Sequence, residues 1–320
     1  MNQVFISSYL TMFYAVAKIL MIAVIAGLLV RKKILLQEHI KGLSEILVLV
    51  LLPALMFSNT ISTFRPNETV GWWILPLLGI GLPLLGIFFC HLLFWNKQKN
   101  GKNIFAISSF PNAAYLILPI GKALFPEKFD EFSVYCFLFV LGFNIILWSL
   151  GKYYITSSGE KIPFKIKEII TPPLIANVSS VLLVLIGLHT YVPKIILEPL
   201  TMIGSATVPM AIFVLGATLG GISFKVWPKL GDILKMMLVK YLLVPITVIF
   251  VLHLLGIREK MLMFSTLLVL EASAAPSTNL ILIMRKYGGD IQAIGGLMII
   301  GYGLAIVIMP IWIAVMELVK

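Results

Sequence analysis

The segments Ser108-Ser109-Phe110-Pro111-Asn112-Ala113-Ala114-Tyr115 and Glu271-Ala272-Ser273-Ala274-Ala275-Pro276-Ser277-Thr278-Asn279 each place a proline and an asparagine inside an apolar stretch. Proline lacks a backbone N–H and disturbs the carbonyl one turn earlier, so each stretch is predicted to contain an interrupted helix. At membrane depth, interrupted backbone is tolerated only where protein or a water-filled cavity surrounds it. The two prolines lie 165 residues apart in a chain of 320. Interrupted helices in corresponding halves of a chain indicate the binding site of a secondary transporter.

The composition is that of a polytopic membrane protein. Hydrophobic residues make up 60% of the chain, charged residues make up 12%, and the mean hydropathy is +1.03. A soluble domain of this length needs more polar surface. The net charge of +11 comes from basic residues in short loops between apolar segments, so we expect no nucleic-acid partner. The first apolar segment lacks a basic start and a cleavage site, and is predicted to be a retained span.

Ten apolar segments of roughly 20 residues or more are predicted to span the membrane. They are Phe5–Val30, Leu43–Thr63, Trp72–Trp95, Ile104–Leu124, Phe132–Tyr154, Ile169–His189, Ile195–Gly221, Ile233–Leu255, Met261–Met284 and Ile291–Val319. Of the 25 lysines and arginines, 16 lie in loops that follow odd-numbered segments and seven lie on the other side. The positive-inside rule places the 16 in the cytoplasm, which predicts a multi-pass protein of the plasma membrane (cell inner membrane) with both termini outside.

The two halves of the chain resemble each other. Pro83 and Pro245 are each followed, at the same spacings, by Ile-Phe and then His-Leu-Leu. The stretch Pro53-Ala54-Leu55-Met56-Phe57 is echoed by Pro209-Met210-Ala211-Ile212-Phe213. With the interrupted segments, these pairs predict a five-helix repeat. Because five is odd, the second repeat enters the membrane from the opposite side, which is the inverted topology used for alternating access.

We therefore expect an all-α membrane protein of ten transmembrane helices, arranged as two inverted five-helix repeats with broken crossover helices 4 and 9. The first repeat covers residues 1–155, a cytoplasmic linker covers 156–168, and the second repeat covers 169–320.

Four motifs, in order and spacing, resemble the auxin efflux carrier family, the PIN-like transporters. They are Leu51-Leu52-Pro53-Ala54-Leu55, Pro111-Asn112, Leu215-Gly216-Ala217-Thr218-Leu219-Gly220, and Ala275-Pro276-Ser277 with Arg285-Lys286-Tyr287-Gly288. The long cytosolic loop of the plant members is missing, which suggests a compact prokaryotic relative. The resemblance implies the fold of the bile-acid/sodium symporters, with an elevator-type transport domain from helices 3–5 and 8–10 and a scaffold from helices 1, 2, 6 and 7.

The interrupted segments supply the predicted substrate contacts. The amides of Asn112 and Asn279 offer donors and acceptors, and half-helix N-termini favour anions, so together they suit a carboxylate. The alternative is that each asparagine only bonds backbone groups freed by its proline. Lys18, near the centre of the first span, would neutralise an anionic substrate or pair with Glu271. The predicted substrate-binding residues are Pro111, Asn112, Pro276, Ser277, Asn279 and Lys18.

Glu271 is the one carboxylate deep within an apolar segment, where ionisable residues are usually functional. It could carry a proton, bind sodium together with freed backbone carbonyls and the hydroxyls of Thr278 and Ser273, or form a structural ion pair. The resemblance to sodium symporters, which keep a glutamate in this stretch, implies a cation role. Lys240, a third of the way into its span, is expected to extend its ammonium toward the cytoplasmic interface, and a functional role is the alternative.

The sequence thus predicts a secondary transporter for a small organic anion, such as a mono- or dicarboxylate or an auxin-like weak acid. The alternatives are a carrier like the bile-acid/sodium symporters or the sodium/proton antiporters, and a non-transporting membrane receptor. No phosphate-binding loop, paired-histidine motif or nucleophile elbow occurs, so no enzyme is expected. We expect no cofactor other than sodium or a proton as coupling ion. Gly216 and Gly220 indicate close helix packing, and a homodimer is expected.

Overall fold

The computed structural model describes residues 2–94, 102–156, 166–222, 227–257, 261–288 and 291–318. The predicted linker 156–168 lies mostly outside these residues. Eight of the basic residues used to predict topology also lie outside them: Lys97, Lys99, Lys161, Lys165, Lys225, Arg258, Lys260 and Lys320.

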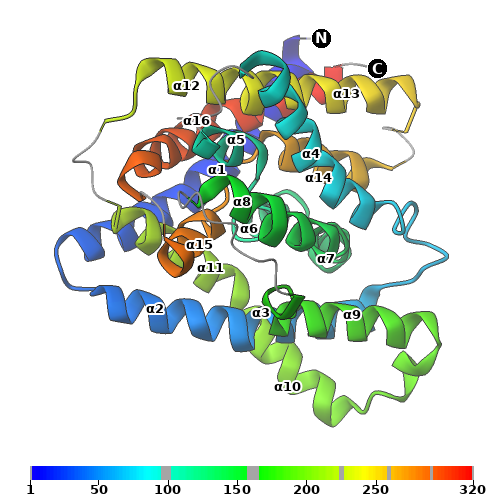
Figure 1. The fold of residues 1–320 in the computed structure, drawn as a ribbon. Helices are drawn as coiled ribbons and strands as arrows, with labels where there is room; N and C mark the ends of the chain where they lie inside the picture. The colour runs from blue at the N-terminus through cyan, green and yellow to red at the C-terminus, as the bar shows by residue number, and fades with distance from the viewer. Residues whose placement is uncertain are drawn as a thin grey trace.

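Helices make up the regular structure of the described residues, and the one β-type pairing among them is an isolated bridge (Figure 1). The α-helices of the first half are α1 (Asn2–Arg31), α2 (Gln37–Ile46), α3 (Leu52–Thr63), α4 (Leu75–Phe94), α5 (Lys102–Ser109), α6 (Ile117–Leu124), α7 (Phe129–Ile146) and α8 (Lys152–Ile155). Those of the second half are α9 (Pro172–Leu185), α10 (Lys194–Ser205), α11 (Thr207–Gly220), α12 (Leu230–Met236), α13 (Val244–Leu254), α14 (Leu262–Ser273), α15 (Asn279–Tyr287) and α16 (Ile291–Leu318).

Short π- and 3₁₀-helical turns connect several of these helices. The π-helical segments are η1 (Leu47–Leu51), η4 (Leu147–Gly151) and η7 (Met237–Leu243). The 3₁₀ turns are η3 (Pro126–Lys128), η5 (Ile166–Glu168) and η6 (Leu188–Tyr191).

Seven helical stretches of the described residues are long and apolar enough to cross a membrane. They are Phe5–Arg31, Gln37–Thr63, Leu75–Phe94, Pro126–Ile155, Lys194–Gly220, Leu230–Leu254 and Ile294–Leu318. These stretches coincide with seven of the ten predicted spans. The protein is therefore an all-helical protein with multiple candidate membrane spans.

The other three predicted spans are built differently. The fourth consists of the short helices α5 and α6, and the ninth consists of α14 and α15, because each stretch is interrupted at its proline. The sixth is the 14-residue helix α9, which begins with two prolines and is shorter than the predicted Ile169–His189.

A proline also shapes the continuous helix that runs from α12 through η7 to α13. Pro245 cannot donate a backbone hydrogen bond, and its ring crowds the carbonyl of Tyr241 four residues earlier. That carbonyl lies in π-helical η7 and accepts a hydrogen bond from Nε1 of Trp312 on α16, with an N–O distance of 2.8 Å. A side chain from another helix thus satisfies the backbone that the proline disturbs.

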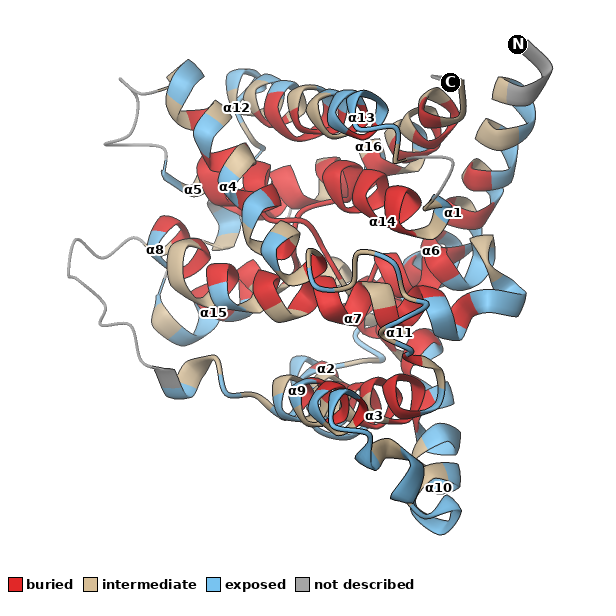
Figure 2. Cartoon of the chain, turned by 90° about the vertical axis from the view of Figure 1, so that its right-hand side faces the viewer, coloured by how far each residue is buried: buried red, intermediate tan, exposed pale blue. Residues whose placement is uncertain are grey.

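The helices form two groups (Figures 1 and 2). Helix α3 packs against α9 and α10, and in both views α2, α3, α9 and α10 lie together below the rest of the molecule. Above them, α4 packs on α7, and α14 packs on α13 and α16. Helix α14 is buried from Phe264 to Ser273, as expected for a helix that is apolar on all sides.

Glycines bring α1 and α11 into close contact. A Cβ atom added to Gly216 would lie 2.0 Å from the carbonyl oxygen of Ala23, and one added to Gly220 would lie 2.4 Å from Cα of Gly27. The predicted role of Gly216 and Gly220 in close helix packing is therefore confirmed, and the partner helix belongs to the same chain.

We predict that Gly216→Ala destabilises the protein by about 1–3 kcal/mol, because the new methyl group forces α1 and α11 apart. Gly81→Ala is the matched control, since a Cβ atom at Gly81 on α4 meets nothing within 4 Å. The control should be neutral or slightly stabilising, because alanine favours helix more than glycine does. Thermal unfolding of the purified proteins measures both effects, and equal midpoints for the two variants would contradict the packing argument.

Candidate functional site

The two interrupted helices cross and pair with each other. Between α5 and α6, and again between α14 and α15, the backbone is non-helical and forms an antiparallel bridge from Pro111 to Pro276. The backbone N–H of Asn112 donates to the carbonyl of Ala275 at 2.9 Å, and the N–H of Ser277 donates to the carbonyl of Phe110 at 3.0 Å. Each broken helix thus satisfies backbone groups of the other in an apolar interior, where unpaired groups would be costly.

A cavity of about 110 Å³ lies beside this crossing. Helix α3 and segment η1, the crossing itself, α7 with η4, and the start of α9 contribute its walls. Its polar lining residues are Asn112, Asn144, Thr171, Ser277 and Asn279. Its aromatic lining residues are Tyr115, Phe143 and Trp148. The cavity therefore combines hydrogen-bonding groups with an apolar wall.

The amide of Asn112 is partly engaged within the protein. Its Nδ2 donates to the hydroxyl of Tyr302 on α16 at 2.5 Å, and its Oδ1 accepts from the backbone N–H of Tyr115 at 3.2 Å. A primary amide has two N–H groups and two acceptor lone pairs, so half of its capacity remains. Asn112 therefore bonds freed backbone and also lines the cavity.

Asn279 and Asn144 present amides to the cavity without a hydrogen bond to any other described residue. Asn279 is a predicted site residue, whereas Asn144 and Tyr302 were missed. Both lie in apolar helices, so a search for polar side chains within the predicted spans would have found them. Their location at the crossing is visible only in three dimensions.

Two half-helices direct their N-terminal ends toward the cavity. Ala114 and Tyr115 lie just before α6, and Ser277 lies just before α15, and all three line the cavity. The N-terminal end of a helix carries free N–H groups and a partial positive charge. The site is therefore suited to a negatively charged group.

Glu271 lies on the other side of the interruption from Asn279, near the end of α14. Its side chain is 1% exposed, and neither carboxyl oxygen has a hydrogen-bond partner among the described residues. Lys240 of η7, which is 2% exposed, is the cation whose charge acts on it. The expectation that Lys240 reaches toward the interface is wrong, because the ammonium is enclosed among helices.

The other predicted site residues are placed as follows. Lys18 lies in α1, is exposed and is not among the residues that line the cavity. Thr278 is buried at the start of α15, so it and Glu271 flank the unwound segment. The hydroxyls of Ser108 and Ser109, at the end of α5, are buried without a hydrogen-bond partner among the described residues. Buried oxygens of this kind are suitable ligands for water or a small cation.

Polar contacts join α7 to the lower group of helices. Nδ2 of Asn59 on α3 donates to Oδ1 of Asp130 at 2.9 Å and to Oγ of Ser133 at 3.0 Å. Nδ2 of Asn177 on α9 donates to the carbonyl of Phe137 at 2.7 Å.

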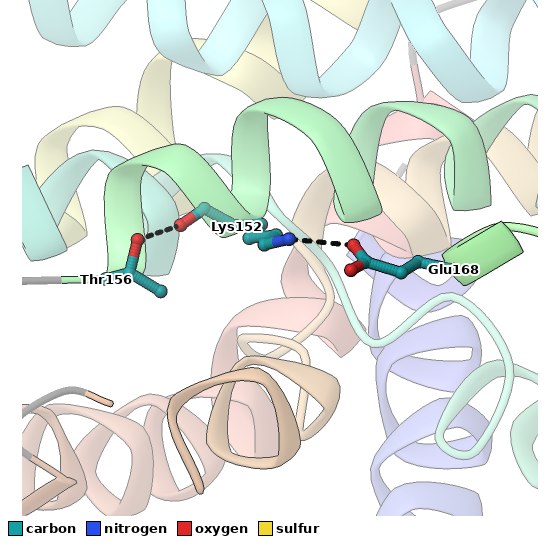
Figure 3. Close-up of polar contacts among 3 residues, drawn as sticks. All are labelled: Lys152, Thr156 and Glu168. Carbon is teal, nitrogen blue, oxygen red and sulfur yellow. Dashed lines mark hydrogen bonds and ion pairs between the residues drawn. The ribbon is translucent and has the colours of Figure 1, made fainter. Parts of the chain in front are cut away.

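A separate ionic cluster lies where α8, η5 and α15 meet (Figure 3). Nζ of Lys152 is 2.7 Å from Oε2 of Glu168, and the two side chains are 4% and 10% exposed. The same ammonium lies 4.0 Å from the ring centre of Tyr287, and the Thr156 hydroxyl donates to the Lys152 carbonyl at 2.9 Å. Burial raises the pKa of Glu168, but Lys152 and the charge of Lys286 together lower it by more than burial raises it. The pKa of Glu168 therefore lies below its usual value of 4.5.

Residues 11–313 match the membrane transport protein family, and the chain belongs to this auxin efflux carrier-like family. It is also 26% identical, over 290 residues, to an uncharacterized transporter of Methanocaldococcus jannaschii; this match covers 87% of the chain and 90% of the relative. The protein is therefore a multi-pass membrane transporter.

We predict that Glu168→Gln lowers thermal stability at neutral pH, because it leaves the charge of Lys152 without its partner. An acidic group whose pKa is lower in the folded than in the unfolded protein stabilises the folded state at every pH above its unfolded pKa. This stabilisation is lost as the pH falls through the pKa of the folded state. The difference in thermal stability between wild type and variant should therefore have its full size above about pH 4.5 and disappear at lower pH.

A double-mutant cycle with Lys152→Met measures the pair itself. We expect a coupling free energy above about 1 kcal/mol, the upper end for exposed pairs. The exposed pair Lys41–Glu45, at 3.8 Å, is the control and should give about 0.2–0.5 kcal/mol. Equal coupling for the two pairs would argue against the buried ion pair.

Proposed function

We propose that this protein is a secondary transporter that moves a small organic anion across the membrane by alternating access. The substrate class is a mono- or dicarboxylate or an auxin-like weak acid. The observation that carries the proposal is the cavity at the crossing, where three asparagine amides and the N-terminal ends of α6 and α15 converge.

The lining supports an anion with a small apolar body. Amide N–H groups and the two helix N-termini stabilise a carboxylate. Phe143 and Trp148 offer flat apolar surface to the remainder of the substrate. The volume is below the roughly 300–1,000 Å³ typical of sites for drug-sized ligands, which favours a small substrate.

The symmetric pairing at the crossing supports the inverted-repeat arrangement. In each half, the residue before the proline accepts a backbone hydrogen bond through its carbonyl, and the residue after the proline donates one through its N–H. These residues are Phe110 and Asn112 in the first half and Ala275 and Ser277 in the second. We propose ten transmembrane helices in two inverted five-helix repeats. The scaffold then contains α1, α2–α3, α9 and α10–α11, and the transport domain contains the rest.

The contacts between these two parts suggest an inward-facing state. Asn59 and Asn177 hold α3 and α9 against α7, and Asn59 lies near the predicted outer end of its span. The cavity instead reaches Val48, Trp148 and Thr171, near predicted cytoplasmic ends. Alternating access would break the outer contacts and close the inner cavity.

The predicted topology completes the proposal. We propose a location in the plasma membrane with both termini outside, supported by the 16-to-7 distribution of basic residues. We also propose that the protein forms a homodimer.

Coupling to a cation is proposed at Glu271. Its unpartnered carboxyl oxygens support a site that exchanges a proton or binds sodium beside the crossing. The charge of Lys240 favours the ionised carboxylate and opposes a second cation beside it, so sodium would bind with Lys240 neutral or displaced. Sodium coupling would make the protein similar in mechanism to the bile-acid/sodium symporters.

Substrate binding is tested with Asn279→Ala. A thermal-shift screen against organic acids first identifies a ligand that stabilises the folded protein. We expect Asn279→Ala to weaken its binding about tenfold or more without loss of stability, since a hydrogen bond to a charged group is worth roughly 1.5–3 kcal/mol. Asn112→Ala should weaken binding and also lower stability, because it removes the bonds to Tyr302 and Tyr115.

The exposed Asn67 provides the control, and Asn67→Ala should leave affinity unchanged. Affinity equal to wild type in well-folded Asn279→Ala and Asn112→Ala proteins would remove this cavity from substrate binding.

Coupling is tested with Glu271→Gln in proteoliposomes. If the carboxylate binds sodium, substrate affinity should rise with sodium in the wild type and lose that dependence in the variant. If it carries a proton, the dependence should be on pH. If it only pairs with Lys240, the double variant Glu271→Gln/Lys240→Met should be more stable than either single variant, because neither charge is left uncompensated. Flux that ignores sodium, pH and Glu271→Gln would leave a uniporter.

A further inference from the structure

A second hollow, with a volume of about 370 Å³, lies between α1, α11 and α16. Four glycines, Gly27, Gly216, Gly220 and Gly303, line it. Gly27, Gly216 and Gly220 lie in the close contact between α1 and α11, which forms the floor of the hollow. At Gly303 on α16, a Cβ atom would meet nothing within 4 Å, so the space beside this residue is open. We call this hollow the α1–α16 groove.

The α1–α16 groove is apolar and open to its surroundings. Val24 and Leu28 on its α1 side are 59% and 49% exposed. Arg31 and Tyr302 are its two polar lining residues. In a membrane transporter, exposed apolar side chains of long helices face hydrocarbon. The natural occupant of such a groove is therefore an acyl chain rather than water.

Positive charge marks one end of the groove. Arg31 is the last residue of α1 and lines the groove, and the exposed Lys32 and Lys33 follow it directly. Arg285 adds a fourth cation nearby, since its Nη2 donates to the side chain of Gln37 at 3.3 Å, and Gln37 packs against Gly221 just after α11. Basic clusters at the end of a span attract anionic headgroups of the cytoplasmic leaflet.

We propose that the α1–α16 groove binds one anionic phospholipid, with an acyl chain along Gly303 and Leu28 and the phosphate at Arg31. The apolar groove selects a lipid over a free anion, and the basic end selects an anionic headgroup over a zwitterionic one. This assignment does not depend on which substrate is transported, and its test does not use transport.

The lipid site lies next to the crossing. Tyr302 lines the α1–α16 groove, and its hydroxyl accepts the hydrogen bond from Asn112, which lines the substrate cavity. An acyl chain in the groove would therefore pack against the side chain that positions Asn112.

The test compares dioleoylphosphatidylglycerol with dioleoylphosphatidylcholine, which have the same acyl chains, added to the full-length protein in neutral detergent. Binding to the folded state raises the unfolding midpoint by mass action, so lipid titrations give apparent affinities. We expect phosphatidylglycerol to stabilise the wild type more than phosphatidylcholine does. Gly303→Leu should abolish this preference by filling the groove. Arg31→Gln should weaken phosphatidylglycerol binding about fivefold, and Arg31→Lys should restore it.

Two controls match these variants. Gly81→Leu places the same side chain at another exposed, open glycine, and Lys41→Gln removes a charge from the exposed face of α2. Both should keep the wild-type lipid preference. Equal stabilisation by the two lipids, an unchanged preference in Gly303→Leu, or the same stabilisation by glycerol phosphate without acyl chains would overturn the proposal.

Discussion

Two backbone hydrogen bonds between Phe110–Asn112 and Ala275–Ser277 are the constraint on which the rest of the structure depends. Proline at the centre of each segment breaks its helix, and the freed groups would be unsatisfied in an apolar interior. A backbone carbonyl freed at each break accepts a hydrogen bond from a backbone N–H freed at the other. The exchange fixes where the half-helices begin, and therefore brings the N-termini of α6 and α15 to one cavity.

The polar side chains near the crossing follow from the same constraint. Asn112 can bond the N–H of Tyr115 because the helix does not resume until Ile117. Tyr302 reaches Asn112 because α16 passes the crossing, where Gly301 lies against the ring of Pro276. Two buried ionisable side chains also lie in this region: Glu271 near the end of α14, and Lys240 of π-helical η7, whose charge acts on it. Four buried side-chain oxygens without a hydrogen-bond partner among the described residues, those of Ser108, Ser109 and Glu271, flank the interrupted segments.

The sequence predicted those features that follow from local chemistry. A proline within an apolar stretch breaks a helix whatever surrounds it, so both interruptions were located correctly, and seven long apolar helices lie where hydropathy placed them. Features that depend on helix rotation and packing could not be predicted. The lysine that acts on Glu271 is Lys240, and only the packing of η7 against α14 shows this. Asn144 and Tyr302 belong to the site because their helices face the crossing.

The separation of the two paired segments has a consequence for biosynthesis. Ribosomes add about 5–20 residues per second, so the 165 residues between Pro111 and Pro276 take roughly 8–33 seconds to synthesise. During that interval, the amide of Asn112 and the carbonyl of Phe110 have no partner strand, although the helices around them have already left the ribosome. The first half of the chain must therefore wait in a setting that supplies water or protein contacts to these groups, such as the insertion machinery, before lipid can close around it.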